Sequence, residues 1–216
     1  MTEPERPSCY DANDALLKGS EARLWALIEE RATHGADRKA IDQKIWDLFG
    51  EDWAIVYTDL AGFSRKTTEF GITHFLQVIF EKKRLLLPIV EKHNGILVKV
   101  EADSFLLLFR RASSALRCAI QMQQAAKAYN LERLPEEQVL LCVGIGHGTI
   151  LKLGDSDAYG QEVNAASKLG EDSAKVGEIL MTEAARTAAG EIPGVTYEDF
   201  GPVSASERNY RVVFPP

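Results

Sequence analysis

The order of apolar patterns after Trp53 is the feature that most constrains the fold of this chain. A short apolar run entering a glycine-containing turn predicts a buried strand, and an apolar stripe at helical spacing predicts an amphipathic helix. Strands are predicted at 54–57, Ile96–Val100, Phe105–Phe109 and Val139–Gly144, and helices at Ile72–His93 and Ser113–Asn130. The order along the chain is therefore strand, helix, strand, strand, helix and strand. This order predicts an α+β fold with a ferredoxin-like, antiparallel-rich sheet and helices packed on one face.

Further elements are expected on both sides of this core. Two amphipathic helices between about Asp14 and Gly50, with a break near His34, predict a short helical segment before the sheet. We therefore divide the chain into an N-terminal helical extension, residues 1–50, and a second domain, residues 53–216. The predicted C-terminal elements alternate strand and helix, at Thr149–Leu153, Gln161–Ala174, Glu178–Met181, Glu183–Ala189 and Tyr210–Phe214.

Composition narrows the classes of protein to be considered. The 216 residues carry a formal charge of -7, which disfavours binding to a nucleic acid polymer or to an anionic membrane surface. The apolar runs are far shorter than the roughly 20 residues of a membrane span, and no export signal is visible. The three cysteines share no metal-ligand spacing, which is typical of reduced thiols. We expect a cytoplasmic protein without a membrane partner.

Two aspartates stand where a site for phosphates and divalent cations can form. Asp59 follows the first strand and precedes a turn that contains Gly62, whereas Asp103 lies in the turn of the predicted hairpin. If these strands are neighbours, the two carboxylates converge at one sheet edge and can bridge a pair of Mg²⁺ ions. Taken singly, each aspartate also fits an ordinary role as a helix cap or a turn residue.

Three sequence motifs resemble the catalytic domain of the class III nucleotidyl cyclases. The first is the apolar strand ending in Asp59, followed by Gly62-Phe63-Ser64, and the second is the segment from Lys99 to Asp103. The third runs from Asp157 to Leu169 and includes Gly160, Val163, Asn164 and Lys168. The resemblance covers about residues 53 to 214. Three ordered motifs at compatible spacing are specific, whereas any single one is weak.

The resemblance implies that residues 53–216 form a cyclase-like catalytic domain that works as a homodimer with two composite active sites. In that picture Asp59 and Asp103 of one chain hold two Mg²⁺ or Mn²⁺ ions. The amides of Gly62, Phe63 and Ser64 approach the phosphates of the nucleotide. The partner chain supplies the remaining groups of each site.

The same resemblance assigns the base, the ribose and the product. Lys99 and Asp157 match the pair that reads adenine, whereas guanine-selective relatives usually carry Glu and Cys, or a similar small residue, there. Asn164 matches the residue that orients the ribose and the transition state, and Lys168 stands where the family has a phosphate-binding arginine. The expected reaction converts ATP to 3′,5′-cyclic AMP and pyrophosphate.

Three departures from the family pattern keep other functions open. Lys168 has the charge of the usual arginine without its planar fork of donors. Ala102 replaces a glycine, which is acceptable only if its φ angle is not positive. The segment 151–157 is shorter than the arm that usually grips the partner subunit. Lys168 and the short segment favour a second interpretation, a catalytically weak or inactive module that binds nucleotide or dimerises in regulation.

A cyclase that forms cyclic GMP is a third possibility. The role of the N-terminal helices is open as well. They are either an element for dimerisation or signal input, which would contact a regulatory protein, or padding for the sheet, because an apolar stripe suits both roles.

Overall fold

The computed structural model describes residues 19–215, and of residues 63–66 it describes the backbone alone. The helices are α2 (Glu21–Ala32), α3 (Arg38–Phe49), α4 (Phe63–Phe70), α5 (Ile72–Lys92), α6 (Ala112–Asn130), α7 (Gln161–Ser167) and α8 (Glu183–Ala189), with a 3₁₀ turn η1 (Pro135–Glu137) and a π-helical segment η2 (Lys168–Ser173). The strands are β1 (Gly50–Leu60), β2 (Ile96–Glu101), β3 (Ser104–Phe109), β4 (Leu141–Leu153), β5 (Asp157–Tyr159), β6 (Ile179–Thr182), β7 (Thr196–Asp199) and β8 (Asn209–Val213).

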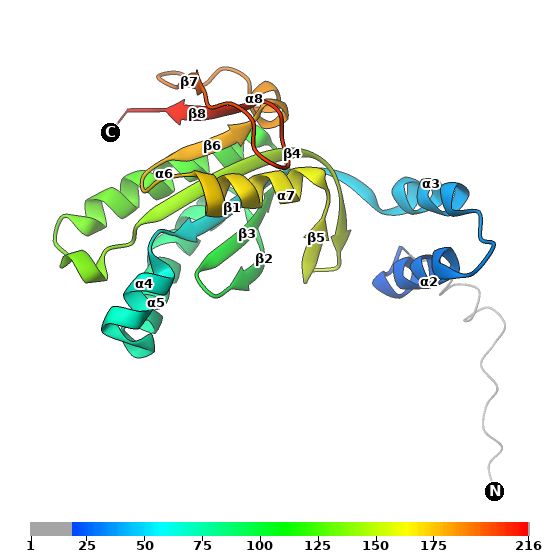
Figure 1. Ribbon diagram of the computed structural model, residues 1–216. Coiled ribbons are helices and arrows are strands. Elements are labelled where there is room, and N and C mark those ends of the chain that lie inside the picture. The colour runs from blue at the N-terminus through cyan, green and yellow to red at the C-terminus, as the bar shows by residue number, and fades with distance from the viewer. Residues whose placement is uncertain (1–18, 216) are drawn as a thin grey trace, which may run out of the picture.

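These strands form one sheet of order β2-β3-β1-β4-β6-β8-β7, with β5 paired to the end of β4 (Figure 1). Strand β4 runs parallel to β6, and the pairs β1–β3, β1–β4, β2–β3, β4–β5, β6–β8 and β7–β8 are antiparallel. The predicted α+β class, the antiparallel-rich sheet and the order of the six core elements are therefore confirmed.

Strand β1 lies at the centre of the core, and its alternate side chains face opposite sides of the sheet. Ala54 and Val56 belong to an apolar cluster that includes buried residues of α5, α6 and α8. Ile55 belongs to a second cluster, in which Val163 and Ala166 of α7 pack on the sheet. Helices therefore cover both faces, and the prediction that they pack on one face alone is wrong.

Three glycines of β4 allow the backbone of α7 to approach the sheet. A Cβ atom on Gly144 would lie 2.0 Å from the Ala166 carbonyl oxygen, and one on Gly146 would lie 2.4 Å from that of Glu162. These glycines therefore mark close contact between backbones and not a turn. The prediction of two separate strands, Val139–Gly144 and Thr149–Leu153, is wrong, because β4 is one strand that pairs with β1 without a break from Leu141 to Leu151.

Most other predicted elements are present with small shifts of their ends. The β2–β3 hairpin and the helices α5, α6 and α8 are confirmed. The predicted helix Gln161–Ala174 divides into α7 and the π-helical η2. The elements α4, β5 and β7 were not predicted, because a polar helix of 8 residues and strands of 3 and 4 residues carry too few apolar positions to show a period.

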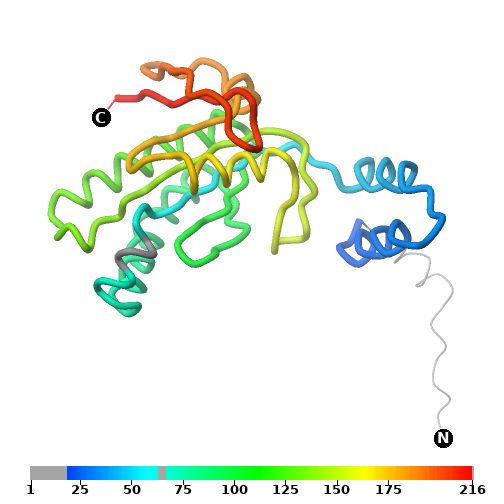
Figure 2. The backbone as a smooth tube through the Cα atoms, viewed as in Figure 1, coloured from blue at the N-terminus to red at the C-terminus, as the bar shows by residue number. Residues whose placement is uncertain are grey.

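Helices α2 and α3 confirm the two predicted N-terminal helices from Glu21 on, and residues 14–18 of the first prediction lie outside the described part of the chain. The two helices pack against each other and against Leu153 of β4. They lie beside one end of the sheet (Figure 2). The boundary proposed at residues 50 and 53 stays a prediction, and β1 already begins at Gly50.

Gly50 joins the helical pair to the sheet directly. Its amide donates to the Trp46 carbonyl in the last turn of α3, while the same residue is the first of β1 and pairs with Leu151 of β4. A Cβ atom on Gly50 would lie 2.6 Å from that Trp46 oxygen and 3.2 Å from a methyl group of Thr149. The junction is therefore closely packed.

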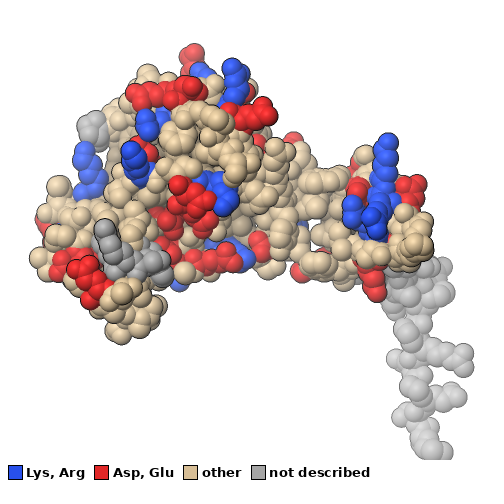
Figure 3. All heavy atoms as spheres, viewed as in Figure 1, with Lys and Arg blue, Asp and Glu red and all other residues tan. Residues whose placement is uncertain are grey.

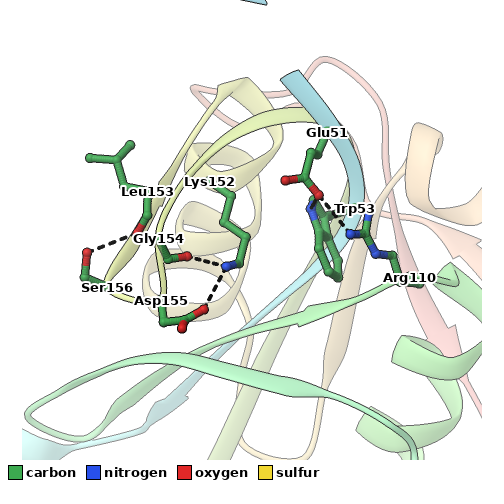
Figure 4. Close-up of polar contacts among 8 residues, drawn as sticks. All are labelled: Glu51, Trp53, Arg110, Lys152, Leu153, Gly154, Asp155 and Ser156. Atoms are coloured by element: carbon green, nitrogen blue, oxygen red, sulfur yellow. Dashed lines mark hydrogen bonds and ion pairs between the residues drawn. The ribbon is translucent and has the colours of Figure 1, made fainter. Parts of the chain in front are cut away.

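The β4–β5 hairpin, Leu151–Tyr159, places Asp157 next to β2. Leu153 pairs with Asp157 across the turn, and the Lys152 ammonium reaches over the turn to the Gly154 carbonyl and to Asp155 (Figure 4). Figure 4 also shows Arg110 beside Trp53, with both side chains bonded to Glu51. The guanidinium carbon of Arg110 lies 3.6 Å from the centroid of the Trp53 ring. These contacts fix the β4–β5 turn and the first residues of β1.

The surface charge and the apolar character of the helices are relevant to binding of nucleic acid or a membrane. Acidic and basic side chains are interspersed over the face shown in Figure 3. Within residues 19–215, no helix is both long enough and apolar enough to cross a bilayer.

Candidate active site

The two predicted metal aspartates lie at the same end of neighbouring strands. Asp59 is near the end of β1, and Asp103 occupies the turn that leads into β3, the strand paired with β1. The Ser104 hydroxyl donates a hydrogen bond of 3.2 Å to Asp59 Oδ1. Asp103 is 6% exposed, and its burial, followed by the charge of Asp59, raises the pKa of its carboxyl to about 6. The structure thus brings the two carboxylates together.

The donor atoms at this position fit an oxygen-seeking divalent cation. Asp103 Oδ2 is buried and has no hydrogen-bond partner, which is an unusual state for a carboxylate oxygen. In the described part of the chain, no group of three or more His, Cys, Asp or Glu side chains is arranged to hold a metal unaided. Mg²⁺ is commonly held by one or two carboxylates together with substrate phosphates and water. The aspartate pair therefore suits ions that share their ligands with a nucleotide.

The predicted glycine turn is the beginning of a helix. Gly62 has φ 81° and precedes α4, whose first residues are Phe63 and Ser64. The left-handed angle explains why glycine stands there. The amides of a first helical turn have no partner within the helix, so they are free to face an anion. The side chains of Phe63 and Ser64 lie outside the described part of the structure.

Lys99 and Asp157 form an ion pair at the mouth of a cavity. Lys99 Nζ lies 3.0 Å from Asp157 Oδ2 and 2.6 Å from Glu101 Oε1, and both carboxylates raise the pKa of the ammonium. Partial burial acts to raise the pKa of Asp157, but bonds from Lys99, the Ala158 amide and the Tyr159 hydroxyl outweigh it and hold that pKa below its usual value. Both groups are therefore charged at neutral pH.

The cavity beside this pair has a volume of about 210 Å³. Its lining includes the base-reading candidates Lys99 and Asp157, together with Asn164 of α7. Asp59 and Asp103 are not part of this lining. One chain therefore presents two groups of predicted residues, which we call the metal aspartates (Asp59, Asp103) and the base pocket (Lys99, Asp157, Asn164). The structure brings the members of each group together, and Ser104, which lines the cavity and donates to Asp59 Oδ1, connects the two groups.

Lys168 lies one helical turn after Asn164, where α7 changes into η2. π-Helical segments are rare and are often found at functional sites. The Lys168 ammonium is half exposed and lies 2.7 Å from Asp172 Oδ2, a hydrogen bond that raises its pKa. The side chain is thus charged, and its present partner is a surface carboxylate.

Two functional candidates were missed by the sequence analysis. Glu171 of η2 accepts hydrogen bonds from Ser167 at 2.7 Å and from Ser104 at 3.4 Å, so it connects η2 with the strand that follows Asp103. Lys82 of α5 is fully buried and its ammonium donates to Thr58 Oγ1 at 3.0 Å and to the Asp103 carbonyl. Burial lowers the pKa of Lys82 to about 7, against the opposing charges of Asp103 and Asp59.

The signal for Lys82 was present in the sequence. The buried stripe of α5 repeats at helical spacing and consists of Phe75, Val78, Lys82, Leu86 and Ile89. A lysine in a core position of such a stripe indicates an internal partner for its charge. Glu171 gave no comparable signal, because a glutamate after a helix is ordinary.

The fold agrees with a comparison against known families. The family model described as the adenylate and guanylate cyclase catalytic domain matches residues 50–205. This chain belongs to that family. The predicted resemblance to the class III cyclases is therefore confirmed.

Similar proteins support the cyclase fold without fixing the substrate. The "Putative adenylate cyclase 3" of Rhizobium meliloti (strain 1021) is 36% identical over 118 residues, which is 54% of this chain and 20% of that protein. The chain therefore spans about a fifth of the length of this relative. The adenylate/guanylate cyclase/hydrolase structure from Silicibacter pomeroyi has a TM-score of 0.67 at 26% identity and covers 77% of this chain and 98% of its own. The adenylyl cyclase CyaB of P. aeruginosa gives 0.65 at 20% identity, with coverages of 77% and 96%, and shows the fold alone.

Proposed function

We propose that this cyclase domain is an adenylate cyclase that converts ATP to 3′,5′-cyclic AMP and pyrophosphate. The observation that carries the proposal is the Lys99–Asp157 pair, at 3.0 Å, on the 210 Å³ cavity that Asn164 also lines. A cation and a carboxylate side by side match the edge of adenine, which presents a ring-nitrogen acceptor and an amine donor. Guanine presents a carbonyl and a ring N–H instead, so the same pair would face like groups.

The residues of the chain act mainly by alignment and by stabilising charge. In the proposed reaction the ribose 3′-oxygen forms a bond to the α-phosphorus, the bond from that phosphorus to the pyrophosphate oxygen breaks, and the 3′-hydroxyl proton leaves to solvent. Asn164 orients the ribose, and Lys168 leaves Asp172 to contact an oxygen on the phosphorus, which it can reach as a flexible point charge. Holding the 3′-oxygen in line with the leaving group supplies much of the acceleration.

Asp59 and Asp103 would hold the two Mg²⁺ or Mn²⁺ ions. The buried, unpartnered Oδ2 of Asp103 supports this assignment. When bound, such ions lower the pKa of a coordinated hydroxyl and offset charge on the phosphates. The main-chain amides of Gly62, Phe63 and Ser64 would face those phosphates at the start of α4.

We further propose a homodimer with composite sites. The resemblance of the three sequence motifs to the class III cyclases supports a site shared between two chains. In the proposed dimer, each site combines the metal aspartates of one chain with the base pocket of the other.

The proposal is tested by product analysis. Purified protein is incubated with ATP or GTP and Mn²⁺ or Mg²⁺, and the products are separated against cyclic AMP and cyclic GMP standards. Cyclic AMP that is lost in Asp103→Ala is the expected result. Cyclic GMP as the main product would contradict the substrate assignment.

A mixing experiment tests the shared sites. Asp59→Ala and Asn164→Ala are each expected to be inactive alone, and a mixture is expected to regain part of the activity, because half of the heterodimer sites contain neither substitution. No recovery, with subunit exchange confirmed by differently tagged chains, would place the complete site in one chain.

One observation favours a second function. Lys168 is already paired with Asp172, so the chain has replaced the usual arginine by a cation with an alternative partner. A regulatory module that binds nucleotide without turnover would show ATP–Mn²⁺ raising the Tm, loss of that shift in Asp59→Ala, and no product at high protein concentration.

A further inference from the structure

Lys82 connects the two strand ends that carry the metal aspartates. Its ammonium donates to Thr58 Oγ1 at 3.0 Å and to the main-chain carbonyl of Asp103. Thr58 immediately precedes Asp59 in β1. A single amino group of α5 is therefore bonded to the neighbour of one metal aspartate and to the backbone of the other.

The bonding around Lys82 leaves it little freedom to move. The residue has no exposed surface, and its ammonium also lies 4.2 Å from the centroid of the Phe105 ring. Thr58 Oγ1 accepts a second bond from the Phe105 amide at 3.2 Å. Because a buried cation is costly unless its donors are satisfied, these contacts fix α5, β1 and the β2–β3 turn relative to one another.

The turn that Lys82 contacts is one that needs such an anchor. Ala102, the residue before Asp103, has φ 48°, a conformation that side chains other than glycine adopt at a cost. The Asp103 carboxylate and the Asp59 carboxylate also repel each other across a short distance. The ammonium opposes both effects, since it holds the carbonyl of Asp103 and attracts the two carboxylates.

We propose that Lys82 is a positioning residue of the two-metal site, which sets the placement of Asp59 and Asp103 before any ion binds. This inference rests on the proposed function, because it assumes that the two aspartates bind divalent ions. It adds to that function a residue from outside the three cyclase motifs. Lys82 touches neither nucleotide nor metal in this role, and it acts through the strand ends that it joins.

The test measures Mn²⁺ affinity of the full chain by calorimetry without nucleotide, so it does not depend on turnover. Lys82→Met keeps an unbranched side chain that is one heavy atom shorter and removes the charge and its donors. We expect Mn²⁺ to bind this variant at least tenfold more weakly than it binds the wild type. The Mn²⁺ concentration giving half-maximal cyclase activity should rise by a similar factor.

A matched control separates positioning from general stability. Gln123 is also buried and polar, and it donates to two main-chain carbonyls, those of Leu141 and Glu178, neither of which belongs to β1 or to the β2–β3 turn. Gln123→Met should lower the Tm and leave Mn²⁺ affinity unchanged. If Lys82→Met lowers the Tm but binds Mn²⁺ as tightly as the wild type, or more tightly, the positioning role is refuted.

A second substitution decides the matter if Lys82→Met does not fold. Thr58→Val removes one acceptor of the ammonium and keeps the shape of the side chain, and it should weaken Mn²⁺ binding severalfold. Unchanged affinity in this variant would refute the role. Absence of Mn²⁺ binding by the wild-type chain would instead refute the proposed function, and the inference about Lys82 with it.

Discussion

Lys99 Nζ lies 3.0 Å from Asp157 Oδ2, although 58 residues separate the two in the chain. Strand β2 supplies the lysine and the short strand β5 supplies the aspartate, so the pairing depends on the β4–β5 hairpin. The complementary charges present a donor and an acceptor side by side. This arrangement is the physical basis for expecting preference between purine bases.

Exchanging the pair should exchange the base. The double variant Lys99→Glu with Asp157→Cys removes the adenine-matching donor and acceptor and introduces an acceptor for the ring N–H of guanine. We expect the ratio of kcat/KM for ATP over GTP to fall by about 100-fold or more, since unpaired buried polar groups penalise the wrong substrate. Steady-state kinetics with both nucleotides measure the ratio. Arg84→Glu, which reverses an exposed charge on α5, should leave the ratio unchanged.

Lys168 should contribute to the rate and little to binding. In the proposed reaction Lys168 stabilises charge in the transition state, so we expect Lys168→Ala to lower kcat by about 100-fold and to change KM by less than about threefold. Asp172→Ala removes only its present partner at 2.7 Å and should keep kcat or raise it. An equal fall of kcat in the two variants would show that turnover depends on the Lys168–Asp172 ion pair and not on a free Lys168 ammonium.

Replacing Ala102 by glycine should stabilise the fold. The structure gives it φ 48°, so the condition under which alanine replaces the family glycine without strain is not met. Ala102→Gly relieves a left-handed conformation at a cost in unfolded-chain entropy, and we expect a net stabilisation of up to about 1 kcal/mol. Urea unfolding measures it. Asn94→Ala, at φ 56°, should change stability in the opposite direction, and a loss of stability in Ala102→Gly would contradict this account.

Gly144 should tolerate no side chain. The Cβ of an alanine there would lie 2.0 Å from the Ala166 carbonyl oxygen and 2.5 Å from the Gly170 amide nitrogen, so α7 and η2 must move away from β4. We expect Gly144→Ala to cost about 1–3 kcal/mol of unfolding free energy, as other overpacked cores do. Gly19→Ala, with no atom within 4 Å of its Cβ, is the control. Equal Tm values for the two variants would show that α7 can shift freely.

The buried thiols should be unreactive and should make stability depend on alkaline pH. Burial raises the pKa of Cys118 to about 12 and that of Cys142 to about 11, from near 9. A raised folded-state pKa stabilises the fold below about pH 9, and this contribution is lost as pH rises through 11 to 12. In a Cys9→Ser background, native protein at pH 8 should not react with a disulfide reagent, and denatured protein should show both thiols. Fast native labelling would indicate local opening.

The sequence predicted the parts of the fold that depend on long periodic patterns. The stripes of α5 and α6 and the apolar runs of β1 and β3 are such patterns, and they determined the order of the core. It failed at Gly144, Gly146 and Gly148, because a glycine that admits a neighbouring helix has the same letter as one that makes a turn. Only the position of α7 distinguishes the two.

The sequence predicted those residues of the candidate site that belong to a recognisable motif. Motifs located Asp59, Asp103, Lys99, Asp157 and Asn164, and the structure groups them as metal aspartates and base pocket. Their roles stay predictions. Lys82 belongs to the site through contacts between α5, β1 and a turn, which no single stretch of sequence contains. The π-helical form of η2 was also out of reach, since it departs from the period on which helix prediction relies.

The shared residue at the α3–β1 junction has a mechanical consequence. Gly50 closes the last turn of α3 and opens a strand of 11 residues, so no slack lies between the helical pair and the sheet. Asp59 is near the far end of that strand, about 30 Å away at the usual rise of a β-strand. A rotation of α2 and α3 would therefore act directly on β1, whose opposite end carries Asp59.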